Sequence, residues 1–193
     1  MGNVLVPFDW SRGYQALAAL SRCPAEEVRR RIKESGLFDT MERGRIEPRE
    51  AARRLGELLE FEIPFEQFRA AWSSIFDPQP NLTEDFLRSL RRKCPLLLVS
   101  NTDAIHYEWI EQHYGLLRHF DERILSFEAG ARKPEPEIYQ QAIARAGCRP
   151  EEVFFADDRP ENVEGALAAG MDAVRFESPA QLEGELRRRG ADW

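Results

Sequence analysis

The chain has 193 residues, 34 of them acidic and 27 basic, so its formal net charge is −7. Hydrophobic residues make up 42% of the sequence, which is enough for a packed core and excludes a largely disordered chain. The acidic balance disfavours general nucleic-acid binding, which needs a basic face, and no apolar run approaches the roughly 18 residues of a membrane helix.

The first residues and the cysteines indicate the cellular setting. Residues 1–7 include an apolar run but no basic flank and no small-residue cleavage site, so no signal peptide is indicated. Cys23, Cys94 and Cys148 are widely spaced and match no metal-ligand pattern. We therefore expect a cytoplasmic protein with free thiols and neither a nucleic-acid nor a membrane partner.

The first half of the chain predicts helices. Apolar residues recur at three- and four-residue spacing in residues 11–21, 24–35, 47–61 and 64–76. A proline-containing connector follows at residues 77–81, and Thr83 is placed to cap the next helix.

The second half predicts short strands that alternate with helices. Apolar runs at residues 95–100, 123–127, 153–156 and 173–176 are typical of buried parallel strands, with helical patterns at 104–113, 136–146, 162–169 and 179–189. This alternation predicts an α/β fold with a doubly wound, mostly parallel Rossmann-like sheet and helices on both faces. We expect residues 1–9 and 81–193 to form this core and residues 10–80 to be an all-helical insertion. The arginine clusters at 29–31 and 187–189 are expected to be solvated helix faces.

Three polar segments follow predicted strands or precede predicted helices, where ligands of open α/β sheets bind. The first is Ser100-Asn101-Thr102-Asp103, whose hydroxyl, amide and backbone N–H groups could cradle an anion. Ordinary helix capping is the alternative.

The second polar segment contains Lys133, which lies just before a helix start and is followed by two prolines, Pro134 and Pro136, that restrict the backbone. A cation is electrostatically unfavourable at a helix N-terminus, so this lysine is better explained by an anion within its reach. A surface lysine without a function is the alternative.

The third polar segment is Asp157-Asp158, at the end of a strand, with Glu161-Asn162 opening the next helix. Adjacent carboxylates repel unless a cation or hydrogen-bond donors hold them, and Mg²⁺ accepts such oxygen-rich sites. A solvated carboxylate pair is the alternative. Together the three segments supply an anion cradle, a cation and a metal site, which are the parts that phosphoryl transfer needs.

The order Ser100-Asn101-Thr102, Lys133-Pro134, Asp157-Asp158 with Glu161-Asn162-Val163, and Ala168-Ala169-Gly170-Met171 resembles the haloacid dehalogenase-like (HAD) hydrolase superfamily. The opening Gly2-Asn3-Val4-Leu5-Val6 and the helical insertion are similar to its branch with a small α-helical cap. The segment Glu42-Arg43-Gly44-Arg45-Ile46 is similar to the sugar-phosphate phosphatases of that branch.

The resemblance implies a role for each matching residue. Ser100 would bind the phosphate with Asn101 beside it, and Lys133 would steady both the phosphate and the attacking carboxylate. Asp158 with Asp157 would hold Mg²⁺, and Asn162 would support them. Gly2, at the position where many family members keep a second aspartate as general acid, would belong to the metal site. The implied substrate is a small phosphorylated metabolite.

The family's nucleophile is an aspartate at the end of a strand that is normally central in the sheet, and it forms an aspartyl-phosphate. In the matching pattern Met1 occupies the position after this aspartate, so we expect the nucleophile and its strand immediately upstream of Met1. Without them the neighbouring strands would keep unpaired edges. The chain as given is expected to be catalytically inactive.

Other interpretations stay open at this point. A late-assigned start is the first explanation of the missing nucleophile, and an inactive member that binds a phosphorylated ligand or a protein is the second. A haloacid dehalogenase uses the same aspartate on carbon, but the retained aspartate pair favours a metal-dependent phosphatase. A receiver domain has its acidic pair first and its lysine last, which is the opposite order. Monomer and homodimer are not distinguished.

Overall fold

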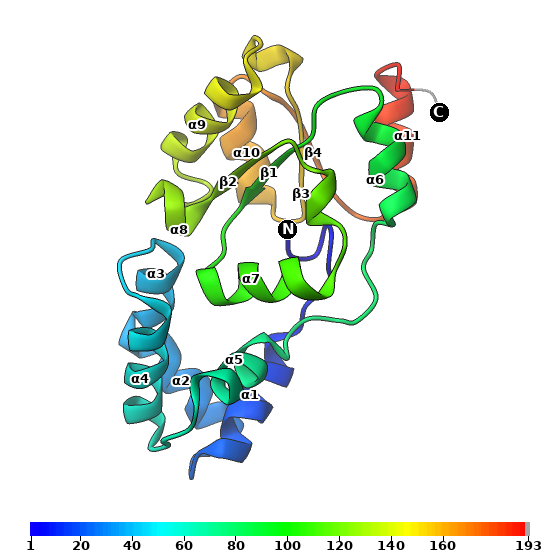
Figure 1. The fold of residues 1–193 in the computed structure, drawn as a ribbon. Coiled ribbons are helices and arrows are strands. Elements are labelled where there is room, and N and C mark those ends of the chain that lie inside the picture. Colours follow the sequence, from blue (N-terminus) through cyan, green and yellow to red (C-terminus); the bar gives the residue numbers. More distant parts are fainter. Residues whose placement is uncertain (192–193) are drawn as a thin grey trace.

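The structure is a computed structural model, and it describes residues 1–191. It has two parts, a helical cap below an α/β core, with helix α7 between them in the view of Figure 1. The cap consists of α1 (Trp10–Leu20), α2 (Ala25–Ser35), α3 (Leu37–Glu42), α4 (Pro48–Leu59) and α5 (Phe65–Ser73). The core consists of α6 (Glu84–Arg91), β1 (Leu97–Ser100), α7 (Ala104–His113), β2 (Glu122–Leu125), α8 (Ser126–Ala129), α9 (Pro136–Ala146), β3 (Phe154–Asp157), α10 (Pro160–Ala168), β4 (Asp172–Arg175) and α11 (Pro179–Arg188).

The cap has a hydrophobic cluster of its own. Leu17, Leu55, Leu59, Phe68 and Trp72 are fully buried in it, and they lie on helices predicted from their apolar spacing. Ile105 of α7 belongs to the same cluster, so the cap packs on the start of α7. The exact boundaries at residues 9/10 and 80/81 stay a prediction.

The strands pair in parallel, as the alternation of strands and helices predicts. β1 pairs with β2 from Leu97 opposite Glu122, and β3 pairs with β4 from Phe154 opposite Asp172. The strand predicted at residues 123–127 ends at Leu125, and residues 126–129 form the helix α8 instead.

The prediction of one sheet is wrong for the described residues, which form two separate two-stranded sheets. Within residues 1–191, β1 pairs only with β2, and β3 pairs only with β4. An apolar cavity lined by residues of both β1 and β3 lies between these two strands. The inner edges of these two strands therefore have no strand partner.

Helices cover both faces of the strands, which is the doubly wound arrangement. Leu98 and Leu125 point into a cluster with leucines of α6 and α11, whereas Ile124 and Phe155 point into a cluster with α9 and α10. Side chains alternate along a strand, so the two clusters lie on opposite faces. In Figure 1 the two helix pairs flank the strands on opposite sides. The C-terminal ends of β1 and β3 are left facing the cap.

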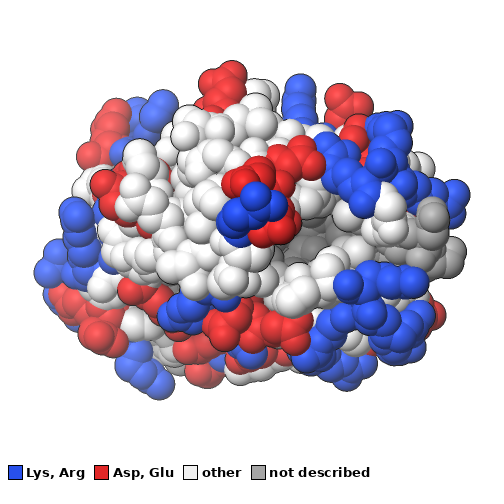
Figure 2. Space-filling model, turned by 90° about the horizontal axis from the view of Figure 1, so that it is seen from above, with Lys and Arg blue, Asp and Glu red and all other residues white. Residues whose placement is uncertain are grey.

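The surface carries acidic and basic side chains side by side (Figure 2). The arginine clusters are solvated helix faces, as expected, because most of their members pair with acidic residues one turn away, as in Arg30–Glu34 and Arg187–Glu183. Among residues 1–191, no helix is long and apolar enough to cross a membrane. The cytoplasmic location stays a prediction.

Candidate active site

Lys133 lies at the centre of the candidate site. Its Nζ donates to Asp157 Oδ2 at 2.6 Å and to the backbone oxygen of Val99 at 2.9 Å. Val99 belongs to β1 and Asp157 ends β3, so this side chain spans the ends of the two unpaired strand edges. Lys133 and Asp157 are only 7% and 4% exposed. The lysine does reach an anion, which is the carboxylate of the predicted aspartate pair.

Asp157 is saturated with hydrogen-bond donors. Its Oδ1 accepts from Asn162 Nδ2 at 2.8 Å and from the backbone N–H of Arg159 at 3.0 Å. Burial alone would raise the pKa of Asp157, but the charge and hydrogen bond of Lys133 lower it below its ordinary value. The carboxylate is therefore held ionised, and Asn162 hydrogen-bonds to it; the supporting role of Asn162 at a metal site stays a prediction.

Asn101 uses its side chain to fix the backbone of Lys133. Its Nδ2 donates to the Lys133 carbonyl at 2.9 Å, and its Oδ1 accepts from the Lys133 N–H at 2.8 Å. Ser100, 1% exposed, ends β1 one residue earlier. The structure thus brings the first and second polar segments together through Asn101.

The loop of residues 1–6 lies against the second aspartate. Asn3 Nδ2 donates to Asp158 Oδ2 at 3.0 Å, and Asn81 Nδ2 donates to the Asn3 carbonyl at 2.6 Å. Gly2 forms an isolated bridge with Val6 in the same loop. The sequence predicts no role for Asn3, because its contact with Asp158, 155 residues away, becomes visible only in the structure.

Whether Asp157 and Asp158 fit a magnesium ion depends on which of their carboxylate oxygens are free. Both oxygens of Asp157 are already engaged, whereas Asp158 Oδ1 accepts no hydrogen bond from residues 1–191. Mg²⁺ is commonly held by one or two carboxylates together with water and substrate phosphates. Asp158 therefore fits a magnesium ligand, and Asp157 fits only after exchanging Lys133 for the metal. Among residues 1–191, no group of three or more acidic, histidine or cysteine side chains is arranged so that it could hold a metal ion.

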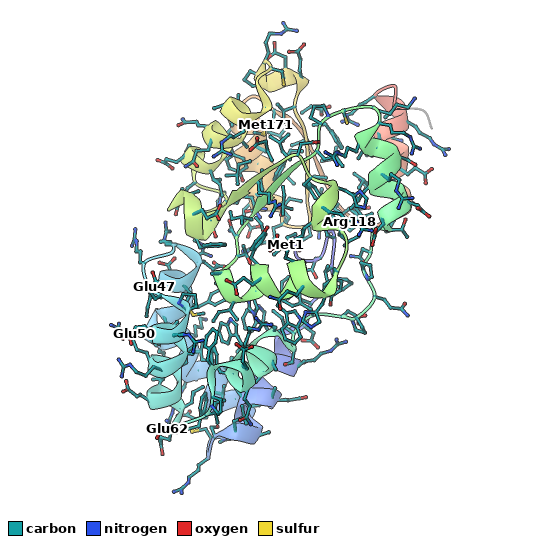
Figure 3. All side chains as sticks on the ribbon, viewed as in Figure 1. Met1, Glu47, Glu50, Glu62, Arg118 and Met171 are labelled. Carbon is teal, nitrogen blue, oxygen red and sulfur yellow. The ribbon has the colours of Figure 1, made fainter. Side chains whose placement is uncertain are left out.

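An apolar cavity of about 150 Å³ lies between β1 and β3. Leu97, Val99, Phe154 and Ala156 line it along the strands, and Lys133 and Asp157 close one end. Met1 also lines it and is labelled near the centre of the molecule in Figure 3. The cavity thus leads along the unpaired strand edges to the polar site.

A buried polar cluster joins the cap to the core beside the site. Asp103 accepts from Trp72 Nε1 at 3.2 Å and contacts His106 Nδ1 at 2.8 Å, while His106 Nε2 contacts the Trp72 carbonyl at 3.0 Å. Burial alone would lower the pKa of His106, but Asp103 raises it. Trp10 and Phe38 pack edge-on or tilted against Trp72, so these cap aromatics form packing contacts.

The model of the haloacid dehalogenase-like hydrolase family matches residues 12–170. The chain belongs to this family of hydrolases. A D-ribitol-5-phosphate phosphatase of Bacteroides thetaiotaomicron is 27% identical over 96% of this hydrolase and 93% of its own length. A fructose-1-phosphate phosphatase of Escherichia coli is 24% identical over 89% and 82%.

Solved structures agree with this membership. A HAD family enzyme of Bacteroides thetaiotaomicron, in complex with magnesium and inorganic phosphate, has 29% sequence identity and a TM-score of 0.84. The similarity covers 93% of this HAD-like hydrolase and 92% of that chain. The recognised resemblance to the superfamily is confirmed.

Sequence reasoning missed the ionic residues on both sides of Lys133 in this HAD-like hydrolase. Arg132 pairs with Asp39 of α3, and Glu135 pairs with Arg43, the residue directly after α3, a helix that was itself not predicted. The sequence does carry a sign of these contacts, because complementary charges occur in two segments, Glu42-Arg43-Gly44 and Arg132-Lys133-Pro134-Glu135.

Proposed function

We propose that this chain is the body of a Mg²⁺-dependent phosphatase that acts on a small sugar or polyol phosphate through an aspartyl-phosphate intermediate. The observation that carries the proposal is the buried Lys133, which reaches the ends of β1 and β3 with Asp158 beside it. A cation and carboxylates at one end of parallel strands are suited to a phosphoryl group.

Each residue has a distinct task in this proposal. Lys133 neutralises phosphate charge, and the Ser100 hydroxyl, which donates to the Asn101 carbonyl at 3.3 Å in this structure, donates instead to a phosphate oxygen. Asn101 keeps Lys133 in place through its two backbone hydrogen bonds. Asp158 would hold Mg²⁺, which, when bound, draws electron density from the phosphate oxygens.

The covalent step requires a nucleophile that we place on a segment preceding Met1. A carboxylate oxygen of an aspartate there attacks phosphorus, and the bond from phosphorus to the substrate oxygen breaks. The departing oxygen takes a proton from water, since Gly2 offers no acidic side chain at the general-acid position. Water then hydrolyses the acyl phosphate, releases inorganic phosphate and regenerates the carboxylate.

The cavity between β1 and β3 supports this placement. Its walls are two unpaired parallel strand edges and apolar side chains, which suit an apolar strand between them. A strand that runs parallel to β1 and β3 would end beside Lys133 and Asp157, at the closed end of the cavity.

The substrate class comes from the relatives. The Bacteroides thetaiotaomicron and Escherichia coli proteins act on D-ribitol 5-phosphate and fructose 1-phosphate, respectively. Both substrates are small phosphate monoesters rich in hydroxyl groups. We propose the same class for this chain.

The test compares three proteins for Mg²⁺-dependent phosphate release from D-ribitol 5-phosphate and p-nitrophenyl phosphate. They are the 193-residue chain, the chain extended by its in-frame upstream genomic sequence, and that extension with its last aspartate changed to Asn. We expect turnover only from the extended chain. Turnover by the 193-residue chain that Lys133→Ala abolishes would place the nucleophile within residues 1–193 and overturn this part of the proposal.

Two alternatives predict other outcomes. A stop codon directly upstream of Met1 would leave a non-catalytic member that binds a phosphorylated ligand or a protein. A haloacid dehalogenase would release halide from a 2-haloacid without Mg²⁺. The aspartate pair at the end of β3 favours the phosphatase over the dehalogenase.

A further inference from the structure

Four side chains and one backbone group form a closed ring of alternating charge between the cap and the core. Arg132 Nη1 donates to Asp39 Oδ1 at 2.6 Å, and both Asp39 oxygens accept from Arg43 Nε at 3.1 Å. Arg43 then makes a bidentate pair with Glu135, at 2.6 and 3.1 Å. Glu135 Oε2 closes the ring by accepting from the Arg132 N–H at 3.1 Å.

The ring includes the residues on either side of the Lys133-Pro134 segment, on which the proposed phosphate site depends. Arg132 and Glu135 lie on either side of Lys133-Pro134, whereas Asp39 and Arg43 both come from the end of the cap that contains α3. α3 packs against α8, directly beneath it in Figure 1. The loop that carries Lys133 is therefore tied to α3 and the residue after it through Arg132 and Arg43.

A third contact places a buried carboxyl group beside the same arginine. Arg132 Nη2 lies 2.7 Å from Glu42 Oε2, and Glu42 is 6% exposed. Arg132 Nε is buried without a hydrogen-bond partner among residues 1–191, so the position of the guanidinium depends on its two carboxylate partners.

The ring is half-buried and connected, which distinguishes it from isolated surface pairs. Arg43 and Arg132 side chains are 19% and 23% exposed, and the bidentate geometry of Arg43 is the strong form of such a pair. The pKa of Glu135 is lowered to about 2, first by its hydrogen bond from Arg43 and then by the Arg132 N–H.

We infer that Arg43 and Glu135 are positioning residues of the phosphate site, which act on bound phosphate through Lys133. The position of α3 on the core and the position of the Lys133 ammonium group are then coupled. On the cap side, the segment Glu42-Arg43-Gly44 provides the contacts that couple them. This inference rests on the proposed function, in which Lys133 contacts phosphate.

The experiment measures the affinity of the full chain for inorganic phosphate in the presence of Mg²⁺ by calorimetry. Arg43→Gln is expected to weaken binding about tenfold, a coupling within the range for residues of one network. In a Lys133→Gln background the same change is expected to alter affinity less than about twofold, because the group through which Arg43 acts is gone. An equal loss in both backgrounds would show a merely structural role and overturn the inference.

A second measurement separates this inference from the proposed function. Amide hydrogen exchange of residues 131–135 is expected to accelerate in Arg43→Gln and in Glu135→Gln, with no further acceleration in the double variant. Exchange at the wild-type rate would overturn the inference whether or not phosphate binds. If phosphate binding is too weak to measure, the exchange rates of residues 131–135 alone test the inference.

Arg53→Gln is the matched control. Arg53 also pairs with two acidic residues, Glu50 and Glu57, but all three lie on α4, and the Arg53 side chain is 56% exposed, against 19% and 23% for the two ring arginines. Glu50, labelled in Figure 3, marks this outer edge of the cap. Arg53→Gln is expected to leave both phosphate affinity and the exchange of residues 131–135 unchanged.

Discussion

At the scale of single residues, Lys133 and Asp157 form a buried charge pair, and the proposed function gives the same pair a chemical role. Both side chains are 5% exposed, so each charge depends on the other for compensation. Lys133→Met is expected to lower the free energy of unfolding by about 3 kcal/mol, the lower end of the range for breaking a buried pair. The Asn162 side chain and the Arg159 N–H remain as hydrogen-bond donors to the Asp157 carboxylate in the variant, which limits the loss of stability.

Urea unfolding of Lys133→Met and Lys93→Met checks this expectation. Lys93 is exposed and has no ion pair among the described residues, so its replacement is expected to change stability by less than about 0.5 kcal/mol. The double variant Lys133→Met, Asp157→Asn removes both charges and should recover part of the loss. Equal stability of the two single variants would contradict a buried charge pair.

Glu42 makes stability depend on pH. Burial raises its pKa from 4.5 to about 7, and Asp103 and Asp39 add to this, whereas Arg132 and His106 oppose it. Because the folded state binds the proton more tightly than the unfolded state, stability falls as the pH rises from about 4.5 to about 7. The contribution is on the order of 3 kcal/mol.

Glu42→Gln removes this titration. The stability of the variant relative to wild type is therefore expected to increase between pH 4.5 and pH 8 by an amount of that order. Urea unfolding of both proteins at the two pH values measures it, and contributions from other groups cancel in the difference. A difference that does not change with pH would mean that the Glu42 carboxyl titrates normally.

At the scale of elements, Gly44 sets how closely α3 approaches the core. Its φ is +63°, and a Cβ atom there would lie 1.9 Å from the Phe127 carbonyl oxygen of α8. Gly44→Ala must therefore strain the backbone and push the cap away from α8. We expect a loss of about 3 kcal/mol or more in the free energy of unfolding.

Gly36 provides the matched control for this prediction. Its φ is +68°, but nothing lies within 4 Å of a Cβ atom built on it. Gly36→Ala therefore meets only the left-handed backbone cost of about 1 kcal/mol. If the two alanine variants lose the same stability, close packing of Gly44 on α8 is not what holds the cap.

The elements themselves differ in how well the sequence predicts them. α7 and α9 begin and end where their apolar spacing and flanking residues place them. α3 was missed because six residues are too few for a periodic pattern, and its limits are set by left-handed glycines at 36 and 44. The polar Ser126 and Glu128 were the sign that β2 gives way to α8.

At the scale of the whole molecule, the fold class and the meeting of the polar segments follow from the sequence. Strand ends meet at one edge of a parallel sheet, so Lys133 and Asp157 were predicted to be close, and they are. The hydrogen-bond partners of Asn101 and Asp103 were not predictable. A side chain that caps a helix, one that bonds to a distant backbone segment and one that binds a ligand all have the same sequence pattern.

The cavity between β1 and β3 is the feature of the whole molecule on which the account depends. It interrupts the sheet, is apolar along its length and ends at the charged site. In the proposed function, an aspartate at the end of a strand in this cavity would meet the lysine and the aspartate pair at the polar end of the cavity.

The most direct test is to locate the phosphoryl group on the protein during turnover. The extended chain is mixed with D-ribitol 5-phosphate and Mg²⁺, quenched in acid, and mapped by peptide mass spectrometry. We expect an acid-stable, base-labile phosphoryl group on the aspartate immediately before Met1. A phosphoryl group on any of residues 1–193, or rapid turnover without a phosphorylated protein, would contradict it.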